Sequence, residues 1–308
     1  MAFLNALPGA VAQGLIWGLM AIGVYISYKI LDIADLTVDG SICTGACVCA
    51  VLIGMGVPAW VSVLVALLAG AVTGVVTGLL HTKLGIPSIL AGILTQLMLY
   101  TVNLLTLNGK SLLAIDPRAN KLLVHMSDNT GSIISLVVIA AITIFALYKF
   151  FYTEIGLTLK STGDNPDMSR AQGVDVNRNK VIGLAIANGI VAMAGALLAQ
   201  YKGSANINDG RGAIVIGLAA IFIGLSISLK IKPNFVVSLI GVIGGGIIYY
   251  IAYNVVILLG LKTDYLKMLS ALIVALFLGI PYLKATYFTK YKDLHPVSQT
   301  TPGGDGNA

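Results

Sequence analysis

The sequence predicts an all-α, polytopic membrane bundle, and three observations carry this prediction: the composition, the apolar runs and the glycine content. Of the 308 residues, 57% are hydrophobic and 10% are charged, whereas soluble domains carry about 25% charged residues. So few charges cannot cover a water-facing surface, and lipid must therefore be the solvent of this chain. The 35 glycines suit membrane helices that pack closely against one another.

Apolar runs of roughly 20 residues predict about nine membrane spans. These spans cover residues 9–30, 37–56, 58–80, 87–107, 132–152, 180–200, 212–229, 234–260 and 264–281. We assign residues 1–281 to one transmembrane domain and residues 282–308 to a tail whose polar end is expected to be disordered. The first ten residues hold no lysine or arginine, so the first span is not expected to be a cleaved signal peptide.

The basic residues predict the orientation of the chain, because lysine and arginine collect in cytosolic loops. With the N-terminus outside, most of the 19 basic residues lie on the inner side. The second span opens with four polar residues, Asp35, Thr37, Asp39 and Ser41. This span is therefore expected to be discontinuous or re-entrant, and in the second case every later loop would change side.

Two segments of the chain resemble each other. Pro58 opens one span and Gly70 follows twelve residues later; Pro233 opens another and Gly245 follows at the same distance. In the orientation above the two spans run in opposite directions, which favours an inverted repeat of the kind that transporters use. The alternative is a chance match between two glycine-rich helices.

Glycines that recur every four residues predict close helix packing. Gly70, Gly74 and Gly78 share one face of a predicted helix, and Gly14 and Gly18 share a face of the first span. Without Cβ atoms, two helices can approach closely along such a face. We expect packing inside one subunit, and a seam between two subunits is the alternative.

A long polar loop, residues 153–180, is predicted on the cytosolic side. Within it Asp164 or Asn165 can cap a short helix, Pro166 suits the first helical turn, and Gly173 can end it. The prediction is a helix of about two turns that docks on a partner. An ordinary connecting loop, which is the alternative, would not need both a start and a stop signal.

The loop and the first two spans together resemble a known family. Residues 156–175 look like the cytosolic coupling loop of permeases of binding-protein-dependent ABC importers, in the branch of branched-chain amino acid, ribose-type sugar and nucleoside permeases. Residues 13–24 resemble the first span of that branch. Residues 35–41 resemble the start of its second span, usually Asp-Leu-Ser-Val-Gly-Ser, although Asp39 is extra here. The resemblance runs from residue 9 to about 281.

The resemblance implies the working partners of the chain. Such permeases lie in the bacterial cytoplasmic membrane and act in pairs, here expected to be a homodimer. Two ATP-binding subunits dock on the coupling loops, and an extracytoplasmic binding protein delivers a small-molecule substrate for import. The residues expected to couple to the ATPase are Gly163, Asp164, Asn165, Pro166, Arg170 and Gly173.

The substrate is expected to be an amino acid, aromatic or branched-chain, because the first two spans look closest to the amino-acid branch. A nucleoside or a simple sugar is the alternative. An ion-coupled secondary transporter is a further alternative from another class: it would work without an ATPase, and its carboxylates would bind the coupling ion.

Polar residues inside the spans are candidates for the translocation path. A carboxylate in lipid costs several kcal/mol, so it is expected to face a cavity or to pair with a base. For Asp39 the alternative is a place in a polar inner loop, and for any polar residue in a span it is a hydrogen bond to a neighbouring helix. The predicted path residues are Asp35, Thr37, Asp39, Ser41 and Gln96.

Other chemistry is not expected of this chain. Residues 108–111 read Asn-Gly-Lys-Ser, but Leu104 stands where a phosphate-binding loop needs glycine, so ATP is expected to be bound by the partner and no cofactor by this chain. Cys43, Cys47 and Cys49 are expected to pack in lipid rather than to bind a metal. No catalytic arrangement and no basic cluster on a polar face are present, so neither an enzyme nor a nucleic-acid-binding protein is predicted.

Overall fold

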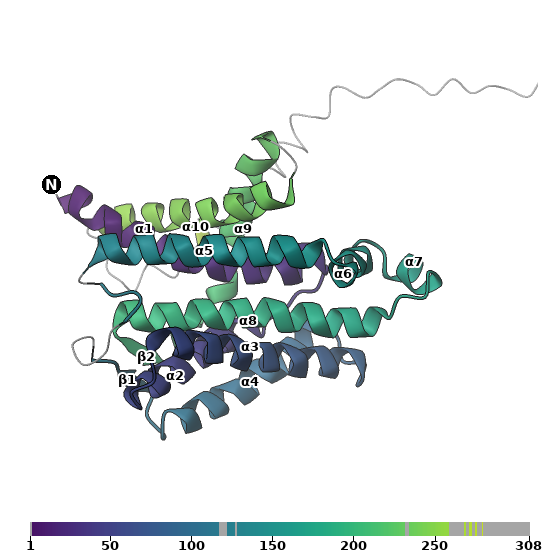
Figure 1. The fold of residues 1–308 in the computed structure, drawn as a ribbon, viewed down its shortest axis with the longest axis horizontal. Coiled ribbons are helices and arrows are strands. Elements are labelled where there is room, and N and C mark those ends of the chain that lie inside the picture. The colour runs from purple at the N-terminus through teal and green to yellow at the C-terminus, as the bar shows by residue number, and fades with distance from the viewer. Residues whose placement is uncertain are drawn as a thin grey trace, which may run out of the picture.

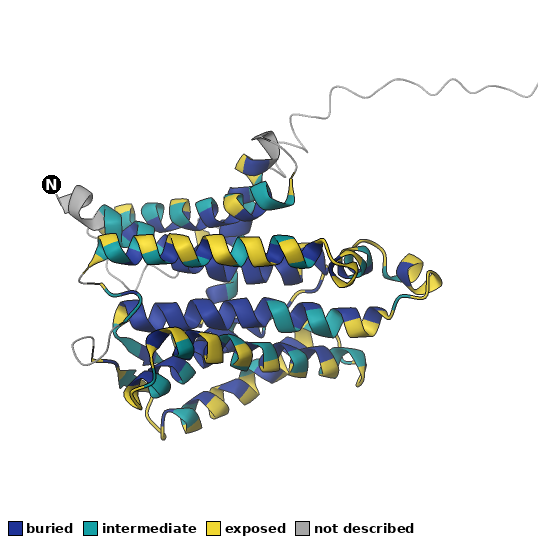
Figure 2. Cartoon of the chain, viewed as in Figure 1, coloured by how far each residue is buried: buried dark blue, intermediate teal, exposed yellow. Residues whose placement is uncertain are grey.

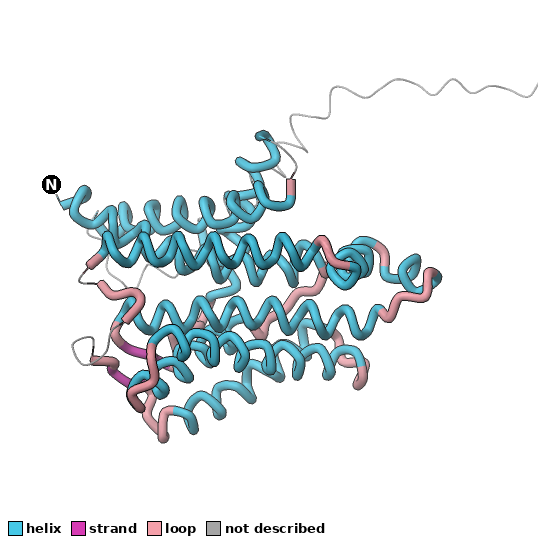
Figure 3. Tube along the Cα trace, viewed as in Figure 1, coloured by secondary structure: helices cyan, strands magenta, loops and turns pink. Residues whose placement is uncertain are grey.

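A computed structural model describes residues 2–116, 122–126, 128–231 and 234–258, and a few single residues beyond them. In this part the chain forms a helical bundle with one pair of short strands (Figure 1, Figure 3). In order, the elements are α1 (Ala2–Tyr25), the π-helix η1 (Ile26–Ile30), α2 (Val38–Gly54), α3 (Ala59–Thr82), α4 (Ser88–Thr106), β1 (Leu112–Ala114), α5 (Asn129–Phe151), α6 (Glu154–Asp164), α7 (Pro166–Ala171), α8 (Val176–Lys202), β2 (Ser204–Asn206), α9 (Ala213–Ile231) and α10 (Phe235–Leu258).

The described helices confirm an all-α membrane bundle. Each predicted span from 9–30 to 234–260 coincides with one of them. Within the described residues, six helices are long and apolar enough to cross a membrane, while α2 and the apolar part of α9 are shorter. The predicted span 264–281 lies almost wholly outside the described residues, as does the tail 282–308, so the count of nine stays a prediction.

The two ends of the bundle differ. Helices α6 and α7 project at one end, and the antiparallel pair β1–β2 lies at the other (Figure 1). Leu112 of β1 pairs with Asn206 of β2, so the strands tie the segment after α4 to the segment after α8. We call these the α6–α7 end and the β1–β2 end.

Helix α8 lies at the centre of the bundle and packs against α1, α2 and α3. It is mostly buried, whereas α4 and α5 expose long apolar faces (Figure 2). Lipid tails are as apolar as leucine, so such faces are stable in a bilayer and helices associate by close packing instead. Small residues from Ala192 to Ala199 give α8 the narrow surface that close packing needs.

The glycine faces pack inside the subunit, as expected. A Cβ atom added at Gly14 or Gly18 of α1 would lie 2.6 or 2.9 Å from backbone carbons of α10. One added at Gly70, Gly74 or Gly78 of α3 would meet α8 at similarly close range. Both helix pairs therefore depend on the missing side chains for their contact.

Candidate translocation site and coupling segment

Two apolar helices, α2 and α9, begin inside the bundle rather than at its ends. Residues 31–37 precede α2 without regular helix and lie along α8, with Leu31 beside Gly183 and Asp35 bonded to Asn188. Helix α2 therefore starts near the middle of α8 and spans only about 25 Å, less than the roughly 30 Å of hydrocarbon in a bilayer. Residues 31–37 cover the distance along α8 from Gly183 to Asn188, where α2 begins.

Helix α9 begins in the same region from the opposite side. The chain leaves α8 at the β1–β2 end, and residues 203–212 return into the bundle before α9 starts. Gly210 packs so tightly on the Asp39 carbonyl that a Cβ atom would overlap it. Helix α9 then runs to the α6–α7 end, where α10 begins beside the last residue of α5, with the Phe235 and Phe151 rings 4.9 Å apart.

The Asp39 carboxylate joins the two helix starts. Its Oδ1 accepts the backbone N–H of Ile214 and its Oδ2 accepts that of Gly212, each at 2.9 Å. The first N–H groups of a helix lack partners within it, and the helix dipole makes that end positive. Asp39 also lies in the first turn of α2, so one negative charge faces the positive ends of two helices.

The other polar residues at the start of α2 form a buried network. The Asp35 carboxylate accepts the Thr37 backbone N–H at 2.9 Å and the Asn188 Nδ2 amide at 2.6 Å. The Ser41 hydroxyl donates to the Asn188 Oδ1 atom at 2.6 Å, and the Thr37 and Thr77 hydroxyls lie 2.7 Å apart. Asp35, Thr37 and Ser41 are at most 2% exposed. These three candidate path residues therefore bind α2 to α3 and α8.

A polar cavity of about 310 Å³ adjoins the junction. It lies between the start of α2, the half of α4 toward the β1–β2 end, and the segment before α9. Its volume is near the lower end for sites that hold small molecules, about 300 Å³. The residues that line it are Asp39, Gly40, Cys43, Gln96, Leu97, Tyr100, Asn103, Ile207 and Arg211.

The structure brings together two of the predicted path residues, Asp39 and Gln96, in this cavity. Sequence reasoning missed Tyr100 and Arg211 as parts of the same wall, whereas Asn103 is one of the polar span residues for which the path and a hydrogen bond to a neighbouring helix are the two alternatives. Positions 96, 100 and 103 are separated by four and three residues, which places them on one face of a helix, and this spacing could have grouped Tyr100 and Asn103 with Gln96. No local signal marks Arg211, because its position depends on the return of residues 203–212.

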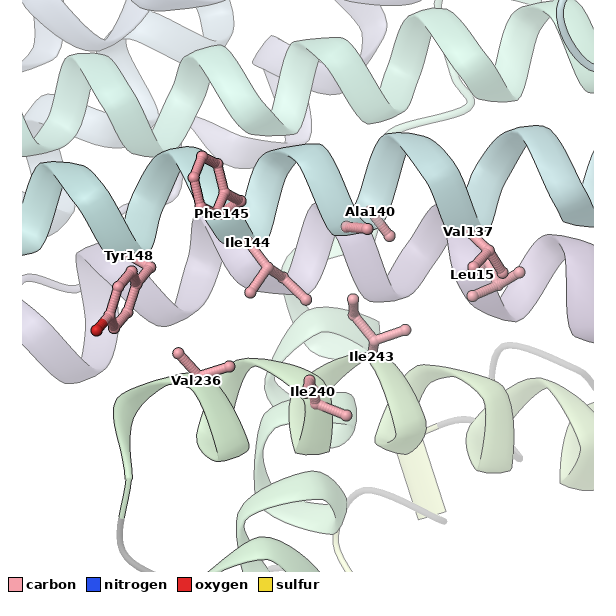
Figure 4. Close-up of a pocket in the computed structure, with 10 residues that line it drawn as sticks. Leu15, Val137, Ala140, Ile144, Phe145, Tyr148, Val236, Ile240 and Ile243 are labelled. Atoms are coloured by element: carbon pink, nitrogen blue, oxygen red, sulfur yellow. The ribbon is translucent and has the colours of Figure 1, made fainter.

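A larger cavity of about 490 Å³ lies between α1, α5 and α10 (Figure 4). Tyr148 is the lining residue with a polar side-chain atom, and the other lining residues are apolar, among them Leu15, Phe145 and Ile243. Such a surface suits a lipid chain and offers almost no hydrogen bonds to a hydrophilic substrate. The smaller, polar cavity is therefore the better candidate for the translocation path.

The cysteines pack within the bundle. Cys43 donates from its Sγ to the Ile207 carbonyl at 3.3 Å and accepts the Gly210 N–H at 3.1 Å, so it holds the segment before α9. Cys47 and Cys49 are fully buried. In the described part of the chain, no group of three or more His, Cys, Asp or Glu side chains is arranged to hold a metal ion.

The capped helix predicted in the coupling loop is confirmed as α7. Asn165 is its N-cap and accepts the Met168 N–H at 3.0 Å, and Pro166 occupies its first turn. Gly173 follows the helix with a φ of +81°, a left-handed conformation that favours glycine. Sequence reasoning missed the preceding helix α6, whose last residue is Asp164.

Helix α6 is held against the bundle. Gly163 packs on the carbonyl of Ile30 at the end of η1, where a Cβ atom would not fit. The Asn179 Nδ2 amide of α8 donates to the Thr162 hydroxyl at 3.0 Å. Gly163 therefore faces inward. The residues that face outward are Asp164, Asn165, Arg170 and Gly173. Contact of these residues with an ATPase stays a prediction.

The comparisons with known proteins agree with this architecture. The family model described as branched-chain amino acid transport system, permease component, matches residues 7–279. The chain is 36% identical over 280 residues to a tyrosine transport system permease protein of Clostridioides difficile, covering 90% of this chain and 91% of that protein. It is 31% identical over 283 residues to an uncharacterized protein of Rickettsia prowazekii, covering 91% and 99%.

A third similarity is partial. The chain is 28% identical over 99 residues to a xylose transport system permease protein of Haemophilus influenzae, covering 32% of this chain and 26% of that protein. No solved structure matches the chain significantly. Since the family model covers almost all of it, the chain belongs to the family of permease components of branched-chain amino acid transport systems, which are multi-pass membrane subunits of ABC transporters.

Proposed function

We propose that this chain forms the translocation path of an ABC importer for an amino acid, aromatic or branched-chain. The observation that carries the proposal is the polar cavity at the α2–α9 junction, whose lining includes both a carboxylate and a guanidinium. The 36% identity to a tyrosine permease favours an aromatic substrate. A nucleoside or simple sugar is the second candidate, supported by the partial similarity to a xylose permease.

The proposal includes three partners in a bacterial cytoplasmic membrane. A separate ATP-binding subunit docks on α7, an extracytoplasmic binding protein delivers the substrate at the β1–β2 end, and a second copy of this chain completes the path. Because ATP binds the partner subunit, this chain needs no cofactor of its own.

A continuous set of contacts would carry motion from α7 to the cavity. Helix α7 follows α6 directly, and Gly163 of α6 packs on Ile30. From there residues 31–37 lead to α2, whose Asp39 binds the start of α9. A shift of α7 would therefore displace the helix starts that border the cavity.

The arrangement of the helices favours an inverted repeat. Helices α1, α2 and α3 alternate in direction, as do α8, α9 and α10, and each member of one set runs opposite to its counterpart. Helix α3 packs on α8 as α10 packs on α1, in both cases through glycines. Rocking of such repeats about a central site is a common basis of alternating access.

Uptake into proteoliposomes tests this function. The full chain is reconstituted with its cognate ATP-binding subunit and binding protein, and uptake of labelled L-tyrosine, L-leucine, uridine and xylose is measured with and without ATP. The proposal predicts ATP-dependent uptake of an amino acid. Uptake of uridine or xylose alone would favour the second candidate, and uptake without the ATP-binding subunit would identify a secondary transporter.

A further inference from the structure

We propose that the α2–α9 cavity is a binding station that recognises both charged groups of a free α-amino acid. In this station the Arg211 guanidinium binds the α-carboxylate, while the Asn103 amide oxygen and the Asp39 carboxylate bind the α-ammonium group. The inference rests on the proposed function, because it concerns the same cavity, and it adds which side chains select the substrate.

The first observation is an unpaired acceptor in the cavity wall. Asn103 is only 2% exposed, and its Oδ1 atom has no hydrogen-bond partner among the described residues. Buried polar atoms in native proteins almost always have a partner, so an exception needs an explanation. Asn103 lines the polar cavity. The oxygen itself has less than 1 Å² of accessible area, so a ligand that donates a hydrogen bond satisfies it only after the amide group turns toward the cavity.

The second observation is a cation in the same wall without an acidic partner. No carboxylate of the described residues lies within ion-pair distance of the Arg211 guanidinium; the two ion pairs found there involve Arg170 and Lys202. The side chain is exposed and lines the cavity just before the start of α9. A guanidinium presents parallel N–H donors that match a carboxylate, which makes it the preferred partner for that group.

The third observation is the spare capacity of Asp39. Its two carboxylate oxygens accept the backbone N–H groups of Gly212 and Ile214 and a further hydrogen bond from the Ala213 backbone, and two carboxylate oxygens together have about four lone-pair sites. The residue is not fully buried and lines the cavity. It can therefore keep its bonds to α9 and also accept a hydrogen bond from an ammonium group. A substrate bound there would contact both helix starts at once.

The walls also select by charge and provide an apolar surface. Paired opposite charges match a zwitterion, whereas a neutral sugar would leave Arg211 without a counter-charge. The exposed Tyr100 and Leu97 side chains border the same cavity and offer an aromatic and an aliphatic contact for the substrate side chain. This combination fits amino acids with large apolar or aromatic side chains.

Protection of a thiol in the cavity tests the station. Gln96→Cys is prepared in this chain, whose native cysteines are at most 4% exposed, and the unsubstituted chain, which keeps Cys43 in the same cavity wall, gives the background rate. The rate at which a methanethiosulfonate reagent modifies the new thiol is measured in the presence of L-tyrosine and of three other probes. Tyramine lacks the carboxylate of tyrosine, 4-hydroxyphenylpropanoate lacks its ammonium group, and xylose is a neutral sugar. We expect L-tyrosine to slow modification several-fold and the other three probes to have little effect.

Further variants assign the contacts. In the Gln96→Cys background, Arg211→Gln should abolish protection by L-tyrosine, and Arg211→Lys should retain part of this protection. Lys110→Gln is the control and should leave protection unchanged, because Lys110 is an exposed cation beyond α4 that does not line the cavity. Asn103→Leu should raise KM for uptake roughly tenfold, as expected for loss of a hydrogen bond to a charged group. Asn103→Asp keeps an oxygen acceptor at this position, so its KM for uptake should stay close to that of the parent protein.

The outcomes separate this inference from the proposed function. Equal protection by L-tyrosine and tyramine would overturn the role of Arg211. ATP-driven uptake of L-tyrosine without protection by any probe would overturn the station and leave the proposed function intact. Protection by xylose but not by L-tyrosine, together with xylose uptake, would overturn both.

Discussion

Replacing Asp39 with asparagine removes the negative charge that faces the starts of α2 and α9. The remaining amide oxygen can still accept one backbone N–H, at a loss of about 1 kcal/mol because the acceptor is no longer charged. The new amide NH₂ cannot accept the second N–H, and this costs a further roughly 2 kcal/mol. We therefore expect Asp39→Asn to lower the free energy of unfolding by about 3 kcal/mol.

Asp32→Asn is the matched control. Asp32 is exposed and has a φ of +54°, a conformation that asparagine adopts readily. The substitution Asp32→Asn makes the same chemical change a few residues away from the junction. We expect this substitution to alter the free energy of unfolding by less than about 0.5 kcal/mol.

The stability of both variants is measured by thermal unfolding of the purified chain in detergent, followed by tryptophan fluorescence. Their transport activity is measured as ATP-driven uptake. Asp39→Asn should unfold several degrees below the parent protein and transport more slowly, and Asp39→Ala should lose more in both measurements. If Asp39→Asn and Asp32→Asn unfold and transport alike, the carboxylate does not hold the junction and the reasoning is refuted.

Three further substitutions test other contacts. Asn165→Ala removes the cap of α7 at a cost of about 1 kcal/mol, and less ATP-binding subunit should co-purify with the chain; unchanged co-purification would exclude α7 as a docking element. Gly163→Leu cannot fit against the Ile30 carbonyl, so α6 should shift and uptake per ATP hydrolysed should fall, while an unchanged ratio would argue against transmission through η1. Asn188→Leu leaves the Asp35 carboxylate buried without its amide donor, and it should destabilise the chain by about 3 kcal/mol; unfolding at the parent temperature would show that the network contributes little.

The features that follow from local chemistry were predictable from the sequence. Apolar runs identify spans because lipid replaces water around them, and the cap, the proline and the glycine around α7 act within a few residues of each other. Helix α6 was missed although Thr153 caps it, with its hydroxyl accepting the Gly156 N–H at 3.3 Å. Its sequence is polar for a membrane protein, and a polar stretch between two spans predicts a loop.

The junction was only partly predictable, because its contacts join distant parts of the chain. The partners of Asp39 lie 173 and 175 residues further along. Sequence reasoning grouped Asp39 with Asp35 and Ser41, since all three are polar residues at the start of one span. In the structure Asp39 faces α9 and the cavity, whereas Asp35 and Ser41 bond to Asn188 of α8.

Blocking the cavity tests most directly whether substrate passes the α2–α9 junction. Gln96→Cys places a thiol in the polar cavity, and Val137→Cys places one at the larger apolar cavity. Each variant is treated with N-ethylmaleimide to complete modification, and ATP-driven uptake of L-tyrosine is measured. We predict that modification abolishes uptake in Gln96→Cys and leaves it intact in Val137→Cys. Full uptake by modified Gln96→Cys would contradict the proposed path.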